Sequence, residues 1–371
     1  MGVGSLGIGK FPGRLGLQQR VLPNYRVPFF DMLAQACEGG MSLFAGMARE
    51  EEAIASADLS RIAYCVRADN VHLFRGPLYL CYQRGMIDWL EKTDPDALIV
   101  EANPRYLATS SAVTWMRARG RKVIGWGLGS PPLSGPLSGF RQTRRIHFLN
   151  QFDALISYSR RGADEYAALG FPREKIFAAM NAVAPKPAFQ VSRSTFHEMP
   201  HILFVGRLQT RKRIDWLLRA CAEMQVKPRL VIVGDGPQRA ALEALAREVY
   251  PAAEFAGAKH GAELKPYFAE ADLFVLPGTG GLAVQEAMAH GLPVVVAKGD
   301  GTQDDLVREG NGWQIPPEDY GALVRVMREA LSDVGRLRRM GAESRRIVAE
   351  EINLETMVET FVRALEFVRQ R

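Results

Sequence analysis

The sequence predicts an α/β protein made of two doubly wound domains that face each other across a cleft. Its 371 residues are more than one ordinary hydrophobic core holds together. Short apolar runs alternate with amphipathic stretches of about ten or more residues, which indicates βαβ units and a parallel sheet. The alternation stops at a proline-rich stretch, residues 180–200, and then restarts. We therefore expect two sheets, one on each side of that linker.

The first half contains five apolar runs that we expect to be strands, separated by helical patterns. A helix is expected at about 27–37, and residues 129–140, rich in Pro, Gly and Ser, are the most loop-like part. The expected strands are LGLQQ (15–19), MSLFAG (41–46), ALIVEA (97–102), KVIGWGL (122–128) and ALISYS (154–159).

The second half repeats this alternation of strands and helices more clearly. Its strands mostly end in glycine, and the apolar residues of its helical segments recur about every 3.6 residues. Ligands of open α/β sheets bind at the carboxyl ends of the strands, so the glycine turns are where we expect chemistry. Residues 320–371 are expected to be all-helical. The expected strands are HILFVG (201–206), RLVIVG (229–234), AEFAG (253–257), LFVLPG (273–278) and PVVVAKG (293–299).

Composition places the chain among soluble globular proteins, with 47% apolar and 24% charged residues. No signal-peptide or membrane-spanning pattern is present, and the four cysteines are scattered, which favours a reducing cytoplasm. The net charge of +6 is uneven: residues 1–190 sum to +7 and residues 191–371 to −1. The first domain should therefore meet something anionic. No nucleic-acid motif appears, so we expect an anionic membrane surface or a phosphate-bearing small molecule rather than nucleic acid.

No metal site is expected. The six histidines are dispersed, without the spacing of a metal-binding motif. Asp94-Pro95-Asp96 imitates the DxD of metal-dependent sugar transferases, but it lies between a helical pattern and a strand, where a solvated turn is the better interpretation.

The chemistry-bearing constellation begins with Arg207 and Lys212, which follow the first strand of the second domain. At the carboxyl end of a strand, one guanidinium and one ammonium suit a diphosphate, although a solvated basic turn would look the same. The second feature is the loop Gly278, Thr279, Gly280 and Gly281, whose amides open the next helix and could bind an anion.

Glu286 is the third feature. It is the one acid of a helix whose other residues are mostly Leu, Ala, Val and Met, and burying a carboxylate without partners costs free energy. Because side chains lean toward the helix N-terminus, Glu286 can reach back to the loop. Ribose hydroxyls would satisfy it, as would protein amides.

These features resemble the donor-binding domain of family 4 retaining glycosyltransferases, which have the GT-B fold. The resemblance covers about residues 200–320, through GRLxxxK, VGDGP (233–237), FxG (255–257), YFAEADLFVLP (267–277) and GLAVQEAMAHGLPVV. More weakly, residues 18–34 and 154–183 are similar to the acceptor domain of bacterial polysaccharide transferases of this family.

The resemblance implies two Rossmann-like domains: an acceptor-side domain at 1–190, a nucleotide-sugar donor-binding domain at 191–345, and a last helix at 346–371 that crosses back to the first domain. It implies that Arg207 and Lys212 hold the diphosphate of a UDP-, GDP- or dTDP-sugar as the catalytic cations. Glu286 would bind the ribose hydroxyls and Lys259 would lie beside the base, with Leu282 completing the donor loop. The nucleotide sugar is a co-substrate, and no cofactor or metal is implied.

One position departs from the family. A second glutamate, eight residues before the one in the helix, usually touches the donor sugar, and here that position is Gly278. Either the loop amides replace the glutamate, or the donor sugar is unusual, or the protein binds a nucleotide sugar without turning it over.

The acceptor is expected to be a glycan or a lipid-linked glycan. Its side of the site is predicted at Asn24, Tyr25 and Arg26, after the first strand, and at Trp126 and Gly127, after KVIGW. Ordinary βα loops with a packed tryptophan are the alternative. In residues 139–152, Arg141, Arg144 and Arg145 alternate with apolar residues. This suits a helix on an anionic bilayer, or one that receives a lipid diphosphate, as well as a plain surface helix.

The predicted function is retaining transfer of a sugar to such an acceptor, by a cytoplasmic protein that is peripheral on the inner face of the membrane. Two other classes remain open. A nucleotide-sugar epimerase of the same fold would need paired acids and a histidine around the sugar, which the glycine loop does not supply. A non-catalytic sugar-nucleotide binding protein would explain Gly278.

Overall fold

The computed structural model describes residues 9–52, 54, 56–188, 199–299 and 301–371, and divides the chain into two compact units. Unit 1 consists of residues 1–183 together with 354–371, and unit 2 of residues 184–353. The sequence-based boundaries lay at residues 190 and 345.

Unit 1 is built on a seven-stranded sheet in the order β3-β2-β1-β6-β7-β8-β9, in which every pair of neighbours is parallel. Strand order reverses between β1 and β6, which makes their carboxyl ends the topological switch point of this sheet. The strands are β1 (Leu15–Val21), β2 (Met41–Gly46), β3 (Cys65–Arg67), β6 (Ala97–Glu101), β7 (Lys122–Gly127), β8 (Ala154–Ser157) and β9 (Ile176–Ala178).

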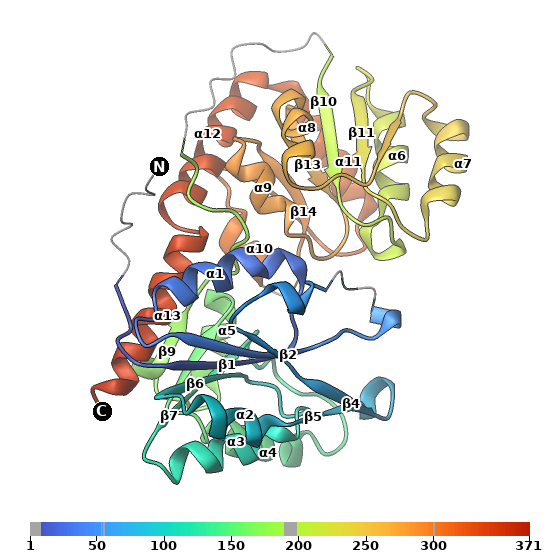
Figure 1. Cartoon of the computed structure of the whole chain (residues 1–371). Helices are drawn as coiled ribbons and strands as arrows, with labels where there is room; N and C mark the ends of the chain where they lie inside the picture. Colours follow the sequence, from blue (N-terminus) through green and yellow to red (C-terminus); the bar gives the residue numbers. More distant parts are fainter. Residues whose placement is uncertain (1–8, 53, 55, 189–198, 300) are drawn as a thin grey trace. The chain divides into compact units, whose positions relative to one another are not determined.

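Helices cover both faces of this sheet, as a doubly wound fold requires. The pairs α1–α13 and α2–α3 each pack together, and Figure 1 shows them on opposite sides of the strands. The C-terminal helix α13 also packs on β7, β8 and β9, so the last helix does return to the first domain. The helices are α1 (Val27–Gln35), α2 (Met86–Thr93), α3 (Ala108–Arg117), α4 (Ser138–Leu149), α5 (Arg160–Ala168) and α13 (Leu354–Arg369).

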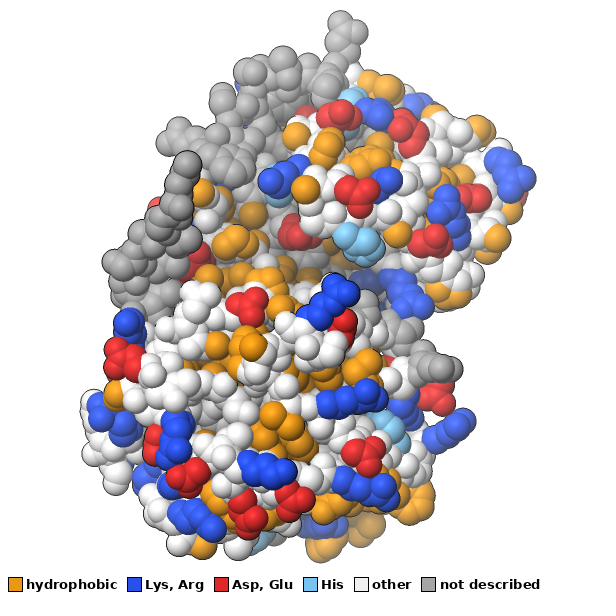
Figure 2. Space-filling view, in the orientation of Figure 1, with side chains coloured by type: hydrophobic (Ala, Val, Ile, Leu, Met, Phe, Trp, Pro, Cys, Tyr) orange, Lys and Arg blue, Asp and Glu red, His pale blue; other side chains and the backbone are white. Residues whose placement is uncertain are grey.

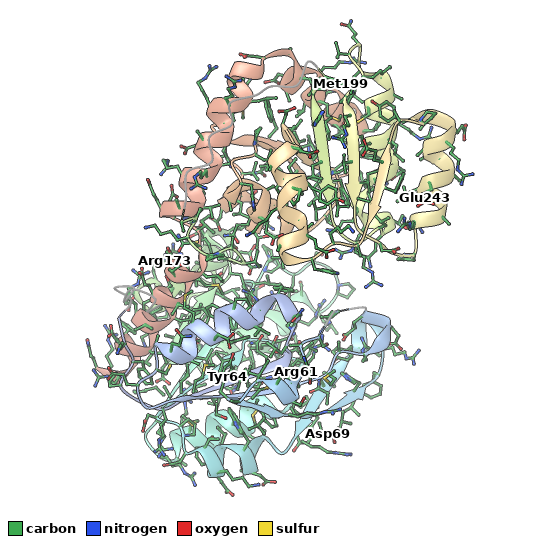
Figure 3. The ribbon with its side chains drawn as sticks, turned by 45° about the horizontal axis from the view of Figure 1, so that its top comes forward. Arg61, Tyr64, Asp69, Arg173, Met199 and Glu243 are labelled. Atoms are coloured by element: carbon green, nitrogen blue, oxygen red, sulfur yellow. The ribbon has the colours of Figure 1, made fainter. Side chains whose placement is uncertain are left out.

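A separate antiparallel hairpin, β4 (Asp69–Leu73) and β5 (Leu80–Arg84), extends from unit 1. Asp69, labelled in Figure 3, pairs with Arg84 across the two strands at 3.3 Å. Both side chains are exposed, so this ion pair contributes little to stability.

Unit 2 carries a six-stranded parallel sheet in the order β12-β11-β10-β13-β14-β15, with its own switch point between β10 and β13. Its strands are β10 (His201–Val205), β11 (Arg229–Val233), β12 (Glu254–Gly257), β13 (Leu273–Leu276), β14 (Val294–Ala297) and β15 (Gly312–Ile315). Its helices are α6 (Ile214–Glu223), α7 (Arg239–Val249), α8 (Lys265–Glu270), α9 (Ala283–Ala289), α10 (Thr302–Leu306), α11 (Tyr320–Ser332) and α12 (Val334–Glu350).

The central strands of both units are continuous apolar runs because helices bury both of their faces. All four residues of β13 and of β14 are buried, as are the first four of β6. Among the described residues, no helix is long and apolar enough to cross a bilayer. The prediction of two doubly wound domains is confirmed.

Candidate active site

The donor-side residues of unit 2 gather at its switch point. Arg207 follows β10, and the loop 278–281 follows the neighbouring strand β13. Between Arg207 and α6 the chain makes a short 3-10 turn, Thr210–Lys212, which packs on that loop: the Thr279 amide donates a hydrogen bond to the Arg211 carbonyl at 3.0 Å. Two segments separated by about 70 residues in sequence are thus joined directly.

Gly278 has no room for a side chain. A Cβ at this position would lie 2.1 Å from the Arg211 carbonyl oxygen and 2.5 Å from the Lys212 Cα, both of which are backbone atoms. A glutamate here would force the turn 210–212 away from the loop. The close approach of the two segments therefore explains why glycine stands where the family resemblance implies an acid.

Lys212 is the buried cation of the site. Its side chain is 5% exposed, and Nζ donates hydrogen bonds to the carbonyl oxygens of Thr279, at 2.9 Å, and Gly280. Burial, helped by the neighbouring charge of Arg211, lowers the pKa of Lys212 to about 8. The ammonium is held by neutral carbonyls and by no carboxylate among the described residues, so an anionic ligand would add the counter-charge that it lacks.

The backbone of Gly280 and Gly281 lies close to this ammonium. Gly280 and Gly281 have φ of +66° and +151°, conformations that favour glycine, and a Cβ on Gly281 would lie 3.6 Å from the Lys212 Nζ. Leu282, half-buried, is the residue before α9. Arg207, which follows β10, is exposed.

Glu286 lies one turn into α9 and is half-buried. Its carboxylate makes no hydrogen bond or ion pair with the described part of the chain, and burial alone raises its pKa. Its neighbour Gln285 is fully engaged: Oε1 accepts from the Ala184 amide at 3.0 Å, and Nε2 donates to the Ile352 carbonyl at 2.7 Å. Gln285 therefore fixes the helix, and Glu286 is left available for ligand hydroxyls.

Lys259 follows β12, is 3.9 Å from Glu263 and lines a cavity of about 460 Å³ with Arg229, Glu254 and Glu270. Since β12 and β13 run parallel in one sheet, Lys259 and the glycine loop both follow the carboxyl end of a strand. In the described part of the chain, the ion pair of Lys259 is with Glu263, and its position beside the base stays a prediction.

The acceptor-side residues of unit 1 gather at the switch point of that unit. A cavity of about 560 Å³, which we call the switch-point cavity, is lined by residues that follow β1, β6 and β7. Tyr25, Arg26, Trp126 and Gly127 line it, whereas Asn24 is exposed and does not.

Arg26 forms the polar floor of the switch-point cavity. It is 5% exposed, donates to the Asn181 Oδ1, and lies 5.3 Å from the Tyr158 ring and 5.5 Å from the Trp126 ring. A guanidinium between aromatic faces is stabilised by cation–π attraction. Arg26 is therefore fixed in place by neutral groups.

Trp126 is 1% exposed and packs edge-on against Phe361 of α13, with ring centroids 4.9 Å apart. Its indole Nε1 has no hydrogen-bond partner among the residues that the structure describes. Trp126 is thus packed in the core of unit 1 and also lines the switch-point cavity, so both expectations for this residue hold.

Sequence reasoning missed Glu101, which ends β6 and lines the switch-point cavity. Its carboxylate accepts a hydrogen bond from the Arg20 amide, and burial raises its pKa to about 7 in spite of that bond and the Arg20 charge. The Arg20 guanidinium itself is bound to Glu52 at 2.9 Å. An acid that closes a buried parallel strand was the signal that could have indicated Glu101.

The remaining predicted residues of unit 1 lie on α4 and in the turn before β6, and of these Arg145 also lines the switch-point cavity. Arg141 and Arg144 are exposed on α4, and Arg145 donates to the Pro131 carbonyl at 2.7 Å. Asp94 was expected in a solvated turn; it does lie between α2 and β6, but it is ion-paired with Arg14 and Arg121, at 2.8 and 2.6 Å. No cluster of metal-ligating side chains is found among the described residues.

Comparison with known proteins agrees with this geometry. Residues 199–333 match the family described as "Glycosyl transferases group 1". The GDP-mannose-dependent alpha-mannosyltransferase of Mycobacterium tuberculosis is 34% identical over 185 residues, 48% of this chain and 47% of that protein. The sulfoquinovosyl transferase SQD2 of Arabidopsis thaliana is 34% identical over 43% of this chain and 30% of that protein. The chain thus matches less than half the length of these relatives.

Solved structures match over nearly the whole chain. The lipopolysaccharide outer core galactosyltransferase WaaB superposes with a TM-score of 0.67 at 15% identity, covering 95% of this chain and 99% of that one. A glycosyltransferase from Rickettsia africae gives 0.70 at 12% identity, covering 98% and 99%. Anabaena HepE with UDP-glucose gives 0.65 at 16% identity, covering 97% and 100%.

These matches define the class of protein first: the chain has the GT-B fold of glycosyltransferases, with two Rossmann-like units. The sequence match is narrower, because residues 199–333 of unit 2 are similar to the group 1 glycosyl transferases. The resemblance drawn from the sequence is confirmed.

Proposed function

We propose that the protein is a retaining glycosyltransferase that moves a sugar from a nucleotide diphosphate sugar to a glycan or lipid-linked acceptor. The observation that carries the proposal is the convergence of Lys212, the loop 278–281 and Glu286 at the switch point of the unit that matches the family. This convergence favours sugar transfer over an epimerase or a non-catalytic binding protein, because the switch point offers a cation for a leaving diphosphate but no pair of acids around a sugar.

In this proposal the cations stabilise the leaving group. Negative charge grows on the diphosphate as the sugar departs, and preorganised cations lower the barrier most where charge develops. Lys212 is fixed by two carbonyls, and the exposed Arg207 offers a fork for a second phosphate oxygen. Both positions supply charge from the chain itself, so we propose that transfer needs no metal ion.

Glu286 would then orient the donor. Its carboxylate lacks a protein partner among the described residues, and burial raises its pKa. Two ribose hydroxyls would satisfy it and lower that pKa again. The loop at 278–281 has no space for an acid, so contacts to the donor sugar would come from its backbone or from the Thr279 hydroxyl.

The donor is proposed to be a UDP-, GDP- or dTDP-sugar. Two observations support the GDP- and UDP-sugars of this range: a relative is named for GDP-mannose, and a structural neighbour was solved with UDP-glucose. A screen of these nucleotide sugars by thermal shift and calorimetry tests it, since a ligand at 100 times its Kd stabilises the native state by about 2.7 kcal/mol.

Lys212→Ala is the decisive variant for that screen, with the exposed Lys227→Ala as its matched control. We expect Lys212→Ala to reduce kcat/KM at least about 100-fold, the scale of removing one charge-stabilising group. Binding and transfer that survive in Lys212→Ala would refute the donor site. Binding without any transfer in the wild-type protein would leave the binding-protein alternative instead.

We also propose that the protein works in the cytoplasm at the inner face of a membrane. The support is the charge of residues 1–190, together with Phe140 and Leu137, which are 62% and 73% exposed beside the arginines of α4. On the face of unit 1 that Figure 2 shows, basic and acidic side chains both lie among apolar ones, so the proposal rests on α4 itself. A helix with exposed basic and apolar side chains binds an anionic bilayer both by electrostatic attraction and by burial of its apolar side chains.

Replacing Arg141, Arg144 and Arg145 by Gln should weaken binding to anionic vesicles by about 1 kcal/mol per charge. Sedimentation with vesicles that contain 30% phosphatidylserine measures this, and neutral vesicles are the control. Unchanged sedimentation of the triple variant would show that α4 is not the membrane contact.

A further inference from the structure

Arg213 has a backbone conformation that favours glycine. It stands between the 3-10 turn Thr210–Lys212 and α6, with φ of +53° and ψ of +40°. In this left-handed region the Cβ of an L-residue crowds the neighbouring carbonyl oxygen. A residue other than glycine stays there only where the surrounding structure holds it. Because Arg213 directly follows Lys212, whatever holds it also acts on the donor site.

The left-handed conformation sets the direction of the chain after Lys212. The Arg213 amide donates to the Thr210 carbonyl at 3.1 Å and closes the 3-10 turn. The Arg213 carbonyl accepts from the amides of Trp216 and Leu217, at 3.1 and 3.3 Å, and so begins α6. A residue in the ordinary helical region would continue the turn straight into α6. The conformation of Arg213 therefore separates the two elements and orients Lys212 on the turn.

The side chain of Arg213 is held by three residues. Its guanidinium lies 3.8 Å from the centroid of the Trp216 ring, which makes a cation–π contact. It also lies 2.7 Å from a carboxylate oxygen of Glu318 and 3.5 Å from one of Asp215. The side chain is only 24% exposed, so water screens these contacts in part. They offset the cost of the left-handed backbone.

Glu318 is itself a left-handed residue, with φ of +56°. Among the residues that the structure describes, five other than glycine have a positive φ, and Arg213 and Glu318 are ion-paired with each other. They are 105 residues apart in sequence. Packing of α6 on α11 supports the pair, since the rings of Trp216 and Tyr320 lie 5.6 Å apart, edge to face. The donor turn is thus held by a third segment, 316–320, besides the glycine loop.

Lys212 is the residue that needs this support. Its Nζ contacts the carbonyls of Thr279 and Gly280 only while the turn directs the side chain into the loop. Burial lowers the pKa of Lys212 to about 8, because the ammonium is less well solvated there than in water. A turn that was free to relax would let the ammonium move out to solvent.

We propose that Arg213 is a positioning residue of the donor site: Trp216 and Glu318 hold its side chain, and its left-handed backbone keeps Lys212 directed into the loop 278–281. The inference rests on the proposed function, in which Lys212 meets the diphosphate of the donor. Arg213 acts through Lys212 and does not itself bind the ligand.

The first test needs no ligand. Competitive acetylation read by mass spectrometry at several pH values gives the titration midpoint of Lys212 in the full chain, with the exposed Lys227 as internal reference. We expect a midpoint near pH 8 in the wild type. In Arg213→Ala, which keeps the Cβ but loses the contacts, the midpoint should rise by at least about one pH unit as the ammonium reaches water.

Arg213→Gly separates the backbone from the charge. Glycine adopts the left-handed conformation without support from a side chain, so the Lys212 midpoint should stay near pH 8. Both variants remove the same guanidinium, and Arg211, the charged neighbour that also lowers this pKa, is present in both. The difference between Arg213→Ala and Arg213→Gly therefore reports the backbone alone.

The second test is nucleotide binding, measured by calorimetry with UDP and with GDP. Arg213→Ala should raise the Kd of the nucleotide that binds the wild type by about tenfold, the scale of one strained residue. Arg213→Gly should stay within about threefold of the wild type. An arginine that touched the diphosphate itself would be missed equally in both variants.

Glu318→Gln tests the ion pair from its other end. It should raise the nucleotide Kd about threefold, the scale of a partly exposed ion pair. In the Arg213→Gly background the same change should have no effect, because glycine has no side chain for Glu318 to hold.

Asp94→Ala is the matched control. Asp94 is another left-handed residue, with φ of +45°, and it is ion-paired with Arg14 and Arg121, but it belongs to unit 1. Its replacement should lower the free energy of unfolding and leave both the Lys212 midpoint and the nucleotide Kd unchanged.

The inference and the proposed function can fail separately. A Lys212 midpoint that is unchanged in Arg213→Ala would overturn the positioning role, and an equal rise in Arg213→Ala and Arg213→Gly would assign the effect to the lost charge and overturn it as well. A midpoint that rises in Arg213→Ala alone would support the positioning role even in a protein that bound neither nucleotide, and that absence of binding would count against the proposed function.

Discussion

Lys212 shows how one residue can link burial to ligand binding. In the free protein its pKa is lowered to about 8, and a bound diphosphate would raise that pKa again by supplying a counter-charge. Above pH 8 the free protein must therefore take up a proton when the donor binds, and affinity falls with rising pH.

We predict that the donor Kd rises by up to about tenfold per pH unit above pH 8 and is nearly constant between pH 6.5 and 7.5. Calorimetry at several pH values measures this. Lys212→Arg should bind the donor with little pH dependence, since a guanidinium keeps its proton over this range. A wild-type Kd that stays flat to pH 9.5 would show that Lys212 does not meet the diphosphate.

Gly278 and Glu286 carry the second prediction. Gly278→Glu should lower turnover and stability, because its Cβ would lie 2.1 Å from a backbone oxygen. Gly310→Ala is the control, since a Cβ there meets only a side-chain atom of Glu343, at 3.5 Å.

Glu286→Gln should retain the fold but weaken nucleotide binding by about 1–3 kcal/mol. A severalfold gain in transfer by Gly278→Glu would contradict the steric argument and mark the loop as a decayed form of the family site.

Glu101 provides a prediction about stability. Its pKa is raised from 4.5 to about 7 in the folded state, so the folded chain binds more protons than the unfolded chain in this range. Stability from this group therefore falls as pH rises from about 4.5 to 7. Glu101→Gln should match the wild type near pH 5 and exceed its free energy of unfolding by at most about 3 kcal/mol at pH 8. Denaturant titrations at both pH values measure the difference; an equal gain at both would point to packing instead of titration.

At the residue scale, the sequence could predict those site residues that lie in a family motif or follow the end of a strand. Arg26, Lys212 and Glu286 were singled out in this way, and Gly278 was recognised as a departure from the family pattern. The reason for that departure lies in the backbone of Arg211, which packs on the loop from the other side of the switch point, and no local pattern reveals such a contact. Asn181 accepts a hydrogen bond from the Arg26 guanidinium, 155 residues away in sequence, and could not be predicted for the same reason.

At the scale of elements, strands were predictable where both faces are buried. Runs such as 97–102 and 293–299 are almost wholly apolar, and each contains an observed strand, β6 and β14. The strands that sequence reasoning missed are short or exposed: β3, β9 and β15 have three or four residues at sheet edges, and β4 mixes polar with apolar residues. Edge strands bury less surface and so carry a weaker apolar pattern.

The C-terminal helix α13 is held to unit 1 by an aromatic cluster, and this gives an element-scale prediction. Phe361 is fully buried, with its ring centroid 4.9 Å from those of Phe29 and Trp126. Phe361→Ala should destabilise unit 1 by about 3–5 kcal/mol. Phe367→Ala, at a half-buried position of the same helix, should cost less. Urea unfolding followed by tryptophan fluorescence compares them, and equal losses would mean that α13 is not anchored at Phe361.

At the scale of the whole molecule, the chain repeats one architecture twice and places polar side chains at the switch point each time. The strand orders of the two sheets follow the same scheme, with the first strand beside the fourth along the chain. This repetition was predictable from the alternation of strands and helices. The switch-point cavity of unit 1 was not, because it depends on side chains from four or more separate segments.

Because donor recognition is assigned to unit 2, ligand binding should leave a regional signature in hydrogen exchange. Amides exchange through local opening, and a ligand that binds only the closed form raises the free energy of that opening. At 100 times its Kd, the nucleotide sugar should slow exchange at 207–212 and 278–286 by up to about 100-fold, corresponding to about 2.7 kcal/mol. Residues 41–46 of β2, a buried strand of unit 1, are the internal control and should not change. Lys212→Ala should abolish the protection at both segments together, because its ammonium joins them through Thr279 and Gly280. Protection that survives in this variant, or that appears at 278–286 alone, would separate the loop from the turn and refute a donor site built from both.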